Sequence, residues 1–554
     1  KHILLLTMIA SFIFSCKRKE NAMHTPETSE KSRIVNIINF IRDIEPRDEA
    51  ITPQVLFETT KSQVAIMQEH HLKGTFLLQY DALIDERYQE LLRGLPRDSF
   101  EVGAWWETPQ PLVEKAGLEW RGRFPWDWHA DVGFSTGYTP AEREKLVDVY
   151  MTDFKEIYGF YPKSVASWFI DAHTLNYMYE RYGIVASANC KDQYGTDGYT
   201  LWGGYWNQAY YPSKVNSYMP AQHEENQIPV PIFRMLGSDP IYQYDTGLEH
   251  DRQGVISMEP VYPESGGNPE WVDWYLDAFI AGEPMEFAYV QAGQENSFIW
   301  RDVKKGFEYQ MPLLEKLQKE GKIRVETLGE SGEWFKQNYE VTPATSVTVN
   351  SDFENGNKRT VWFNSRFYRV NLLWDAGALR FRDIHLFDES IASTYLTKKL
   401  DSNQALFFTQ PFVDGYLWST AQNLAGLRFK YKKDGNTLAL QGGEPIVTSP
   451  EQGKLKIQWP LDEGGEINIL LDEKTTTIEV LNNEDLQWFL EFNAAKKDEL
   501  PYQSITKKKI MSSFQNSDYV VSALRGSFSD TGDGTFKIEP SDNRITLDFS
   551  NMEQ

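Results

Sequence analysis

Cysteine is almost absent from the sequence: among its 554 residues only Cys16 and Cys190 carry a thiol. If Cys16 is modified with lipid, as proposed below, no disulfide is possible within the mature chain. Cys190 could serve as a nucleophile, but a packed small residue is the simpler interpretation of a lone thiol. The fold must therefore be stabilised by its hydrophobic core and polar contacts alone.

Basic residues are also scarce relative to acidic ones. The chain has 56 Lys and Arg against 80 Asp and Glu, a formal net charge of −24. Nucleic-acid binding needs a basic surface, so we expect no nucleic acid among the partners of this protein. An acidic field also repels strongly anionic polymers unless a local basic pocket offsets it.

Long hydrophobic runs are missing, apart from a short one near the start. Ile3–Phe14 follows Lys1 and His2 and is too short to span a bilayer, but it has the form of an export signal. The run ends in Ser15-Cys16, which resembles the cleavage and acylation site of bacterial lipoproteins. This pattern predicts a signal peptide over 1–15, a lipid anchor on Cys16 and a polar tether over 16–32. We expect an outer-membrane lipoprotein that faces the periplasm or the cell surface; the alternative is an ordinary secretory signal with an incidental cysteine.

Residues 33–340 predict an α/β domain. With 554 residues the chain exceeds what one core usually supports, so two domains are expected. In this part short apolar runs alternate with segments of helical period, as in parallel strands joined by helices. The predicted strands are Ile34–Ile41, Lys73–Gln79, Phe100–Trp106, Ser164–Ile170, Gly183–Asn189, Val230–Leu236, Glu286–Ala292 and Ile323–Leu328. Seven or eight such units predict a closed or nearly closed barrel.

Residues 341–554 have a different pattern. Alternating segments such as Thr360–Phe363 and Ile467–Leu471 are separated by Asp-Gly, Asn-Gly and Gly-Gly turns. This pattern is typical of an antiparallel β sandwich. The change occurs near residues 338–345, where we place the domain boundary.

Several segments of the first region resemble polysaccharide deacetylase-like barrels, a fold shared with several groups of glycoside hydrolases. The segments that carry the resemblance are His71–Leu78, Glu101–Gly103, Gly159–Val165, Tyr182–Ile184 and Ile323–Leu328. The resemblance covers roughly residues 33–338. It implies a distorted barrel of seven or eight β/α units, followed by a C-terminal β domain, and an activity on carbohydrates.

The metal site of these deacetylases is not reproduced. The resemblance would place paired aspartates after the first strand, but the sequence there reads Arg42-Asp43. It would place a His-x-x-x-His pair after the third strand, but the sequence there reads Ala104-Trp105-Trp106-Glu107. We therefore expect no cofactor, and leave open a divalent metal held by an unusual set such as Asp43, His129 and His173.

Four carboxylates that follow predicted strands are the candidate catalytic residues. Parallel strands point their C-terminal ends to one rim of a barrel, where Asp43, Glu107, Asp171 and Glu295 should converge. Glycosidic bond hydrolysis needs two carboxyl groups, one protonated and one ionised. Asp171 is the first choice, because the resemblance places the nucleophile of related barrels after the equivalent strand; its alternative role is to cap the helix that follows. Glu107 is the second choice.

Two long insertions, Glu107–Tyr138 and Lys191–Gln227, are rich in aromatic residues, Gly and Asp and should lie over the same rim. Aromatic rings stack on sugars, and amides and imidazoles bond to their hydroxyls, although a packed lid is an equally good interpretation of Trp202–Gln208. The candidate substrate-binding residues are Arg42, Trp105, Trp106, Trp126, Trp128, His129, Trp168, His173, Asp192, Trp202, Trp206 and Asn207.

The sequence thus predicts a carbohydrate-active hydrolase, with a glycoside hydrolase as the first choice and a polysaccharide or oligosaccharide as its substrate. A metal-dependent polysaccharide deacetylase and a non-catalytic glycan-binding lipoprotein remain as alternatives. The sequence of the C-terminal β part indicates no specific function for it.

Overall fold

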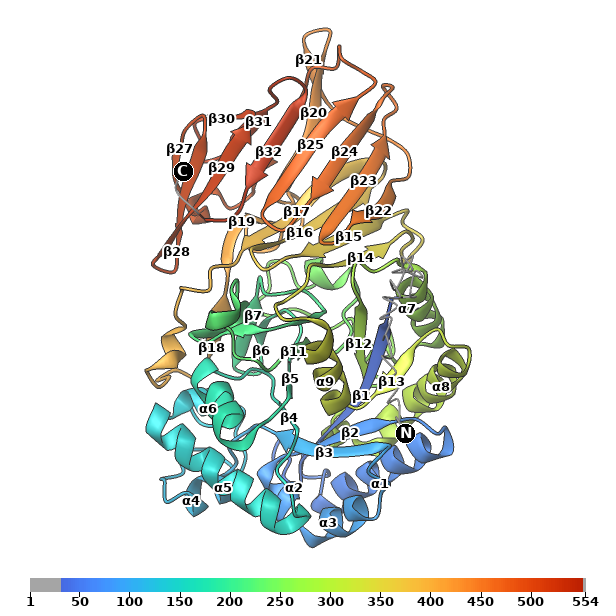
Figure 1. Cartoon of the computed structure of the whole chain (residues 1–554), viewed down its shortest axis with the longest axis vertical. Helices are drawn as coiled ribbons and strands as arrows, with labels where there is room; N and C mark the ends of the chain where they lie inside the picture. Colours follow the sequence, from blue (N-terminus) through green and yellow to red (C-terminus); the bar gives the residue numbers. More distant parts are fainter. Residues whose placement is uncertain (1–30, 552–554) are drawn as a thin grey trace, which may run out of the picture.

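The computed structural model describes residues 31–551, and the predicted signal peptide and Cys16 lie outside this range. Figure 1 shows a barrel-like α/β part below and a stack of β sheets above it. No helix among the described residues has the length and apolar character needed to cross a membrane.

The α/β part is built on one curled sheet in which all eight predicted strands are present. Its strands are β1 (Arg33–Ile41), β2 (Gly74–Leu78), β3 (Phe100–Trp105), β4 (Ser164–Ala166), β5 (Ala186–Asn189), β8 (Ala209–Tyr210), β11 (Ile232–Arg234), β12 (Ala288–Ala292) and β13 (Arg324–Glu326). The order is β12-β1-β2-β3-β4-β5-β11-β8, with β13 beside β1. The pairs from β12 to β11 are parallel, and only β8 runs antiparallel. Because β11 and β12 are not neighbours in this order, the barrel is open along one seam.

All but the last of the following helices cover the outside of the sheet, and the last packs in the barrel interior through Leu328 and Phe335. They are α1 (Pro53–Glu69), α2 (Tyr80–Ile84), α3 (Glu86–Arg93), α4 (Gln110–Lys115), α5 (Pro140–Tyr158), α6 (Ala172–Tyr182), α7 (Pro269–Ala281), α8 (Ile299–Lys319) and α9 (Leu328–Asn338). Local sequence sets their ends. In α5, for example, Thr139 and Glu142 form a capping box, Pro140 occupies the first turn, and Gly159 ends the helix at φ 83°.

Side chains of β1 alternate between the two faces of the sheet. Ile37 and Ile41 pack in the core between sheet and helices, whereas Ile38 and Phe40 pack in the barrel interior. The period of two continues past the strand end, so Arg42 turns inward and Asp43 outward. This alternation decides which rim residue can reach the barrel axis.

The C-terminal part is an antiparallel sandwich, as predicted. One sheet contains β14 (Thr345–Val349), β15 (Arg359–Asn364), β16 (Tyr368–Asp375), β17 (Ala378–Leu386), β19 (Gln410–Asp414), β20 (Gly426–Lys433), β21 (Asn436–Ala439), β26 (Trp488–Asn493), β30 (Ser527–Asp530) and β31 (Phe536–Glu539). The other contains β22 (Ile446–Glu451), β23 (Lys454–Pro460), β24 (Glu466–Leu471), β25 (Thr475–Leu481), β27 (Tyr502–Ile505), β28 (Lys509–Phe514), β29 (Ser517–Arg525) and β32 (Arg544–Asp548). Their facing side chains form a second large core. We call this part the β domain.

The insertion Lys191–Gln227 is more regular than the sequence indicated. It forms β6 (Gln193–Thr196), β7 (Tyr199–Trp202), β9 (Pro212–Ser213) and β10 (Asn216–Pro220) as well as β8. A segment of the β domain, β18 (Ala405–Phe408), pairs with β7 in parallel. The two parts of the chain are therefore joined by a shared sheet above the rim of the barrel.

Candidate functional site

The site is centred on Arg42, which follows β1 and is almost completely buried. Its guanidinium forms two hydrogen bonds to Glu107, with Nη2 to Oε1 at 2.9 Å and Nε to Oε2 at 3.1 Å. Arg42 Nη1 lies 2.7 Å from Glu295 Oε2 and 4.0 Å from Glu45 Oε2. Carboxylates that follow β1, β3 and β12 thus converge on one cation. We call Arg42, Glu45, Glu107 and Glu295 the rim group.

Glu107 is held on both oxygens. Besides the two bonds from Arg42, Gln79 after β2 donates from Nε2 to Glu107 Oε2 at 2.5 Å. Burial raises the pKa of the Glu107 carboxyl, and the charge of Arg42 opposes that effect. With every oxygen engaged, Glu107 is placed to orient the Arg42 side chain.

Tryptophan rings form the wall of the site. The Arg42 guanidinium lies 4.2 Å from the centre of the Trp126 ring, in cation–π contact. Trp105 and Trp168 meet edge to face inside the barrel, with ring centres 5.2 Å apart. These three predicted binding residues therefore do lie at the inner face of the rim.

Glu259 is the acid that sequence reasoning missed. Its oxygens accept hydrogen bonds from Ser257 Oγ at 2.8 Å and from Gln294 Nε2 at 3.1 Å. Burial is the main cause that raises the pKa of Glu259 to about 7, and the nearby charge of Glu295 contributes. In the described part of the chain no Lys or Arg lies within ion-pair distance of it. Glu259 is therefore a buried carboxyl poised to be protonated near neutral pH.

Lys191, directly after Cys190 and β5, is a second unexpected group. Its side chain is inaccessible to solvent, and its Nζ donates to the backbone oxygen of Asp192 at 3.3 Å. Burial lowers the pKa of Lys191, while the charge of Glu259 works against that shift. Cys190 is buried too, with a pKa raised to about 11, which fits the packed residue expected from the sequence.

The site meets solvent at Arg47 and Asp197. Arg47 is 34% exposed, binds Glu45 with Nε to Oε1 at 2.7 Å and lies 5.1 Å from the Trp126 ring centre. Its Nη1 lies 3.9 Å from Asp197 Oδ2, which is 57% exposed. A loop after β1 and the β6–β7 turn thus meet above the rim group.

Asp171, the first choice from the sequence, has other partners. It caps α6, where Oδ1 accepts from Thr174 N at 2.9 Å and Oδ2 from Thr174 Oγ1 at 2.7 Å. Arg143 and Ser135 bind the same two oxygens at 2.9 and 2.6 Å. The capping alternative is confirmed, and these contacts give no support to a catalytic role. The strand before it ends at Ala166, four residues earlier than predicted.

Asp43, His173 and His129 are not brought together. Asp43 turns outward to α3, where Arg87 Nη2 lies 3.0 Å from both of its oxygens. His173 pairs with Glu144 across α5 and α6 at 3.1 Å. His129 lies beside Trp128 in the long insertion. Among the described residues these three form no metal-type cluster.

Four more predicted binding residues lie away from the rim group. Trp106 packs against Tyr150 in the outer core. Trp206 stacks on Trp362 of the β domain with ring centres 4.3 Å apart, and Asn207 donates to the backbone of Ser238 at 3.3 Å. Trp202 donates from Nε1 to Asp414 Oδ2 at 2.7 Å. The Trp202–Gln208 loop thus matches the packed-lid interpretation.

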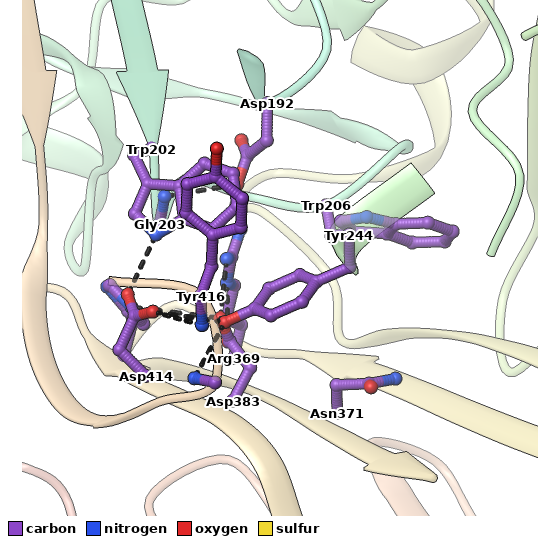
Figure 2. Close-up of polar contacts among 12 residues, drawn as sticks. Asp192, Trp202, Gly203, Trp206, Tyr244, Arg369, Asn371, Asp383, Asp414 and Tyr416 are labelled. Atoms are coloured by element: carbon purple, nitrogen blue, oxygen red, sulfur yellow. Dashed lines mark hydrogen bonds and ion pairs between the residues drawn. The ribbon is translucent and has the colours of Figure 1, made fainter. Parts of the chain in front are cut away.

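Asp192 belongs to a second buried ionic cluster, which spans the two parts of the chain. Figure 2 shows Asp192 and Trp202 of the barrel part meeting Arg369, Asp383 and Asp414 of the β domain. We call Asp192, Arg234, Arg369, Asp383, His385 and Asp414 the interface group. Its pairs are described below.

Asp383, His385 and Asp414 have the donor types and spacing of a metal site. However, the atoms that would bind a metal already take part in hydrogen bonds. His385 Nε2 lies 3.0 Å from Asp414, and His385 Nδ1 lies 2.8 Å from Thr409 Oγ1. Asp383 is bound on both oxygens by Arg369 at 2.8 Å. A buried cluster satisfied in this way is built as an ionic network.

The rim itself does not fit a divalent metal. The position after the third strand holds Trp106 and Glu107, and the Glu107 carboxylate is bound by a guanidinium. Arg42 already supplies the positive charge among these carboxylates, and its side chain fills their centre.

Sequence reasoning found Arg42, Glu107, Glu295, Trp105, Trp126 and Trp168, and it missed Glu259, Lys191, Gln79 and Arg47. The position of Gln79 directly after β2 was a usable signal. Glu259 gave none, because it lies in a loop rich in Pro and Gly, Met258–Gly267, that follows no strand.

The sequence model of one domain family, a domain of unknown function (DUF3863) with a solved structure, matches residues 129–350, less than half of the chain. The search of curated proteins gave no match.

Among solved structures, the chain is similar to a protein from Parabacteroides distasonis described as a glycoside hydrolase/deacetylase. The two are 16% identical over 70% of this chain and 92% of that chain, with a TM-score of 0.51. A polysaccharide deacetylase from Pseudomonas aeruginosa (10% identity, 56% and 93% coverage, TM-score 0.34) and a 4-α-glucanotransferase from Thermococcus litoralis (9%, 94% and 99%, 0.31) are more distant. The first similarity shows that this chain shares the fold of the Parabacteroides distasonis protein. The scores of the other two are too low to add to that.

Proposed function

We propose that this protein is a glycoside hydrolase acting on a polysaccharide or oligosaccharide, with Glu259 as the proton donor and Glu295 as the ionised carboxylate. The observation that carries the proposal is the contrast between these two acids. Glu259 is bonded only by neutral donors and has a pKa near 7, whereas Glu295 lies 2.7 Å from the Arg42 guanidinium. One protonated and one charged carboxyl group are what glycosidic bond cleavage needs.

A side-chain hydrogen bond ties Glu259 to the segment that carries Glu295. Gln294 donates from Nε2 to Glu259 and directly precedes Glu295 after β12. Glu259, in its own loop, is therefore held beside the end of the strand that carries Glu295. In the proposed reaction Glu259 gives its proton to the leaving glycosidic oxygen, while Glu295 attacks the sugar carbon or accepts a proton from water.

Arg42 and Lys191 have supporting roles in this proposal. Arg42 fixes the Glu295 carboxylate and is itself oriented by Glu107. Lys191, which is inaccessible to solvent, acts on Glu259 through its charge, which lowers the pKa of that carboxyl group. Trp126, Trp105 and Trp168 provide apolar faces that exclude water from the acids.

The test measures new reducing ends on a panel of neutral oligosaccharides. Glu259→Gln and Glu295→Gln should each lower the rate by about 10²- to 10⁴-fold. Glu101→Gln is the control: Glu101 is a partly buried acid near the start of β3, at the opposite end of the barrel, where it accepts a hydrogen bond from Ser164 Oγ at 2.6 Å. Wild-type rates in both site variants would contradict the proposal.

The rate should also depend on pH in a defined direction. Glu259 must be protonated to act, and its pKa of about 7 means that the protonated fraction falls as pH rises above 7. We expect the rate to drop about tenfold per pH unit in that range. A rate that keeps increasing up to pH 9 would exclude Glu259 as the acid.

The two alternatives differ in their products. A metal-dependent deacetylase would release acetate, and a chelator would abolish the release. A glycan-binding protein would bind oligosaccharides and form no product. No contact at the rim supports either alternative in the way that the difference between Glu259 and Glu295 supports a glycoside hydrolase.

We also propose that the protein is exported and attached to the outer membrane through Cys16. The support is the leader sequence Ile3–Cys16. Metabolic labelling with palmitate should mark the wild type and fail for Cys16→Ser; equal labelling would refute the anchor.

A further inference from the structure

The interface group connects the β domain to the rim of the barrel through ion pairs and hydrogen bonds. We propose that Arg369 of the β domain is a positioning residue for Lys191, acting through Asp192. The importance of Lys191 rests on the proposed function, but the contacts of Arg369 do not.

Asp192 is the barrel's contribution to the interface group, and donors surround its carboxylate. Oδ1 accepts from Tyr218 OH at 2.7 Å and Arg234 Nη2 at 2.8 Å. Oδ2 accepts from Gly203 N at 3.0 Å and from Arg369 Nη1. Burial alone would raise the pKa of Asp192, but the charges of Arg369 and Arg234 outweigh it and the pKa is lowered. The residue that follows Lys191 is thus fixed as an anion.

Arg369, on β16, is fully buried and contacts both parts of the chain. Its Nε and Nη2 bind Asp383 on β17 at 2.8 Å each, a paired geometry available to Arg and not to Lys. Its Nη1 binds Asp192 and the backbone oxygen of Gly204, the latter at 2.7 Å. The guanidinium is therefore held in place by the β domain and presented to the rim loop.

The other residues of the β domain in the interface group, His385 and Asp414, are connected to the same loop through Thr409 and Trp202. The Thr409 hydroxyl donates to Gly203 O at 2.7 Å and lies 2.8 Å from His385 Nδ1. His385 Nε2 lies 3.0 Å from the Asp414 carboxylate. Trp202 Nε1 donates to Asp414.

Each acid of the interface group has a basic partner. Asp192 is paired with Arg234 and Arg369, Asp383 with Arg369, and Asp414 with His385. Removing Arg369 takes the cation from Asp192 Oδ2 and both paired bonds from Asp383. Arg234 and Tyr218 still bind Oδ1 of Asp192 and Gly203 N still binds Oδ2, but a buried carboxylate that has lost one of its cations draws water or moves toward it. Asp192 is the side of this pair that lies in a loop, so it is the side that should move.

Movement of Asp192 reaches Lys191 directly. Lys191 Nζ is bonded to the backbone oxygen of Asp192, and the two residues are adjacent. Loss of Arg369 should therefore expose Lys191 to solvent, although Arg369 makes no contact with it.

The experiment uses the full chain and a lysine acylating reagent, with the modification of Lys191 quantified by mass spectrometry. The wild type should leave Lys191 unmodified, and Arg369→Met should raise its modification rate at least tenfold. The matched control is Arg382→Met. Arg382 is an equally buried arginine of β17 that crosses the same interface to Ile241 O at 2.7 Å and does not contact Asp192.

Arg369→Lys separates positioning from general loosening. It keeps the charge and loses the paired geometry, so Lys191 should become intermediate in reactivity. If Arg369→Met does not fold, this variant decides the question against Arg382→Lys. Equal protection of Lys191 in the Arg369 and Arg382 variants, or equal exposure in both, would overturn the proposal.

This labelling needs no substrate, so it can succeed or fail independently of glycan cleavage. If cleavage is established, Arg369→Met should lower kcat more than it raises KM, and Arg369→Lys should restore part of kcat. Loss of activity with Lys191 still protected would contradict positioning and leave the proposed function standing.

Discussion

The rim group and the interface group are both buried, and each is built around an arginine that lies among carboxylates, three around Arg42 and two around Arg369. They differ in how completely their charged side chains are paired. In the interface group every charged side chain has a partner of opposite sign, and Asp383, His385 and Asp414 are inaccessible to solvent. Beside the rim group lies Glu259, which has only neutral partners, and Arg47 there remains one-third exposed.

This difference separates a structural network from a chemical one. A balanced, sealed set of charges resists change in protonation, because adding or removing a proton leaves a buried charge unpaired. An acid with neutral partners can change its protonation near neutral pH, as a proton donor must. Metal-type residue composition alone selects the interface group, whereas the acid with neutral hydrogen-bond partners lies beside the rim group.

The largest expected effect tests what the groups share. Arg42→Met and Arg369→Met should each lower the free energy of unfolding by about 3–5 kcal/mol, because each leaves buried carboxylates without their cation. Urea unfolding followed by circular dichroism measures this. A loss below about 1 kcal/mol for Arg369→Met would show that the interface group is not a paired network.

An intermediate effect tests how the groups differ. The pKa of Glu259 is raised to about 7 in the folded protein from an ordinary value of 4.5, so its contribution to stability is complete at low pH and is lost as pH rises through 7. Glu259→Gln should therefore be more stable than the wild type above pH 7, by up to about 3 kcal/mol. Unfolding curves at pH 5 and pH 8 would reveal it.

Asp414 should affect the pH dependence of stability in the opposite direction to Glu259. Its pKa is lowered, because hydrogen bonds and the charge of His385 outweigh burial, so its contribution is present at neutral pH and is lost as pH falls. Asp414→Asn should be less stable than the wild type at pH 8. If both variants shift stability in the same direction at pH 8, the contrast between the two groups is wrong.

The smallest effect concerns His173, which lies outside both groups. His173→Ala removes an exposed pair with Glu144 and should change the free energy of unfolding by less than about 1 kcal/mol. Glycan cleavage should stay at the wild-type rate. A strong loss of activity would instead support the hypothesis that Asp43, His129 and His173 bind a metal.

The sequence by itself determined the fold class and the rim. Periods of two and 3.6 residues mark strands and helices, and parallel strands place their C-terminal ends together. Arg42, Glu107 and Glu295 were therefore found from local pattern. Local sequence also sets the starts of α1 and α7, because Pro53 and Pro269 occupy the first turn, where proline is favoured.

Only the tertiary structure decided which rim acids face inward and which are already occupied. Asp171 and Glu107 look alike in sequence, but Arg143 and Ser135 come from elsewhere in the chain to bind Asp171. Glu259 reaches the site on an irregular loop, and Asp192 is bound by Arg369, 177 residues away. Burial and long-range charge set these roles, and neither has a period that a sequence can display.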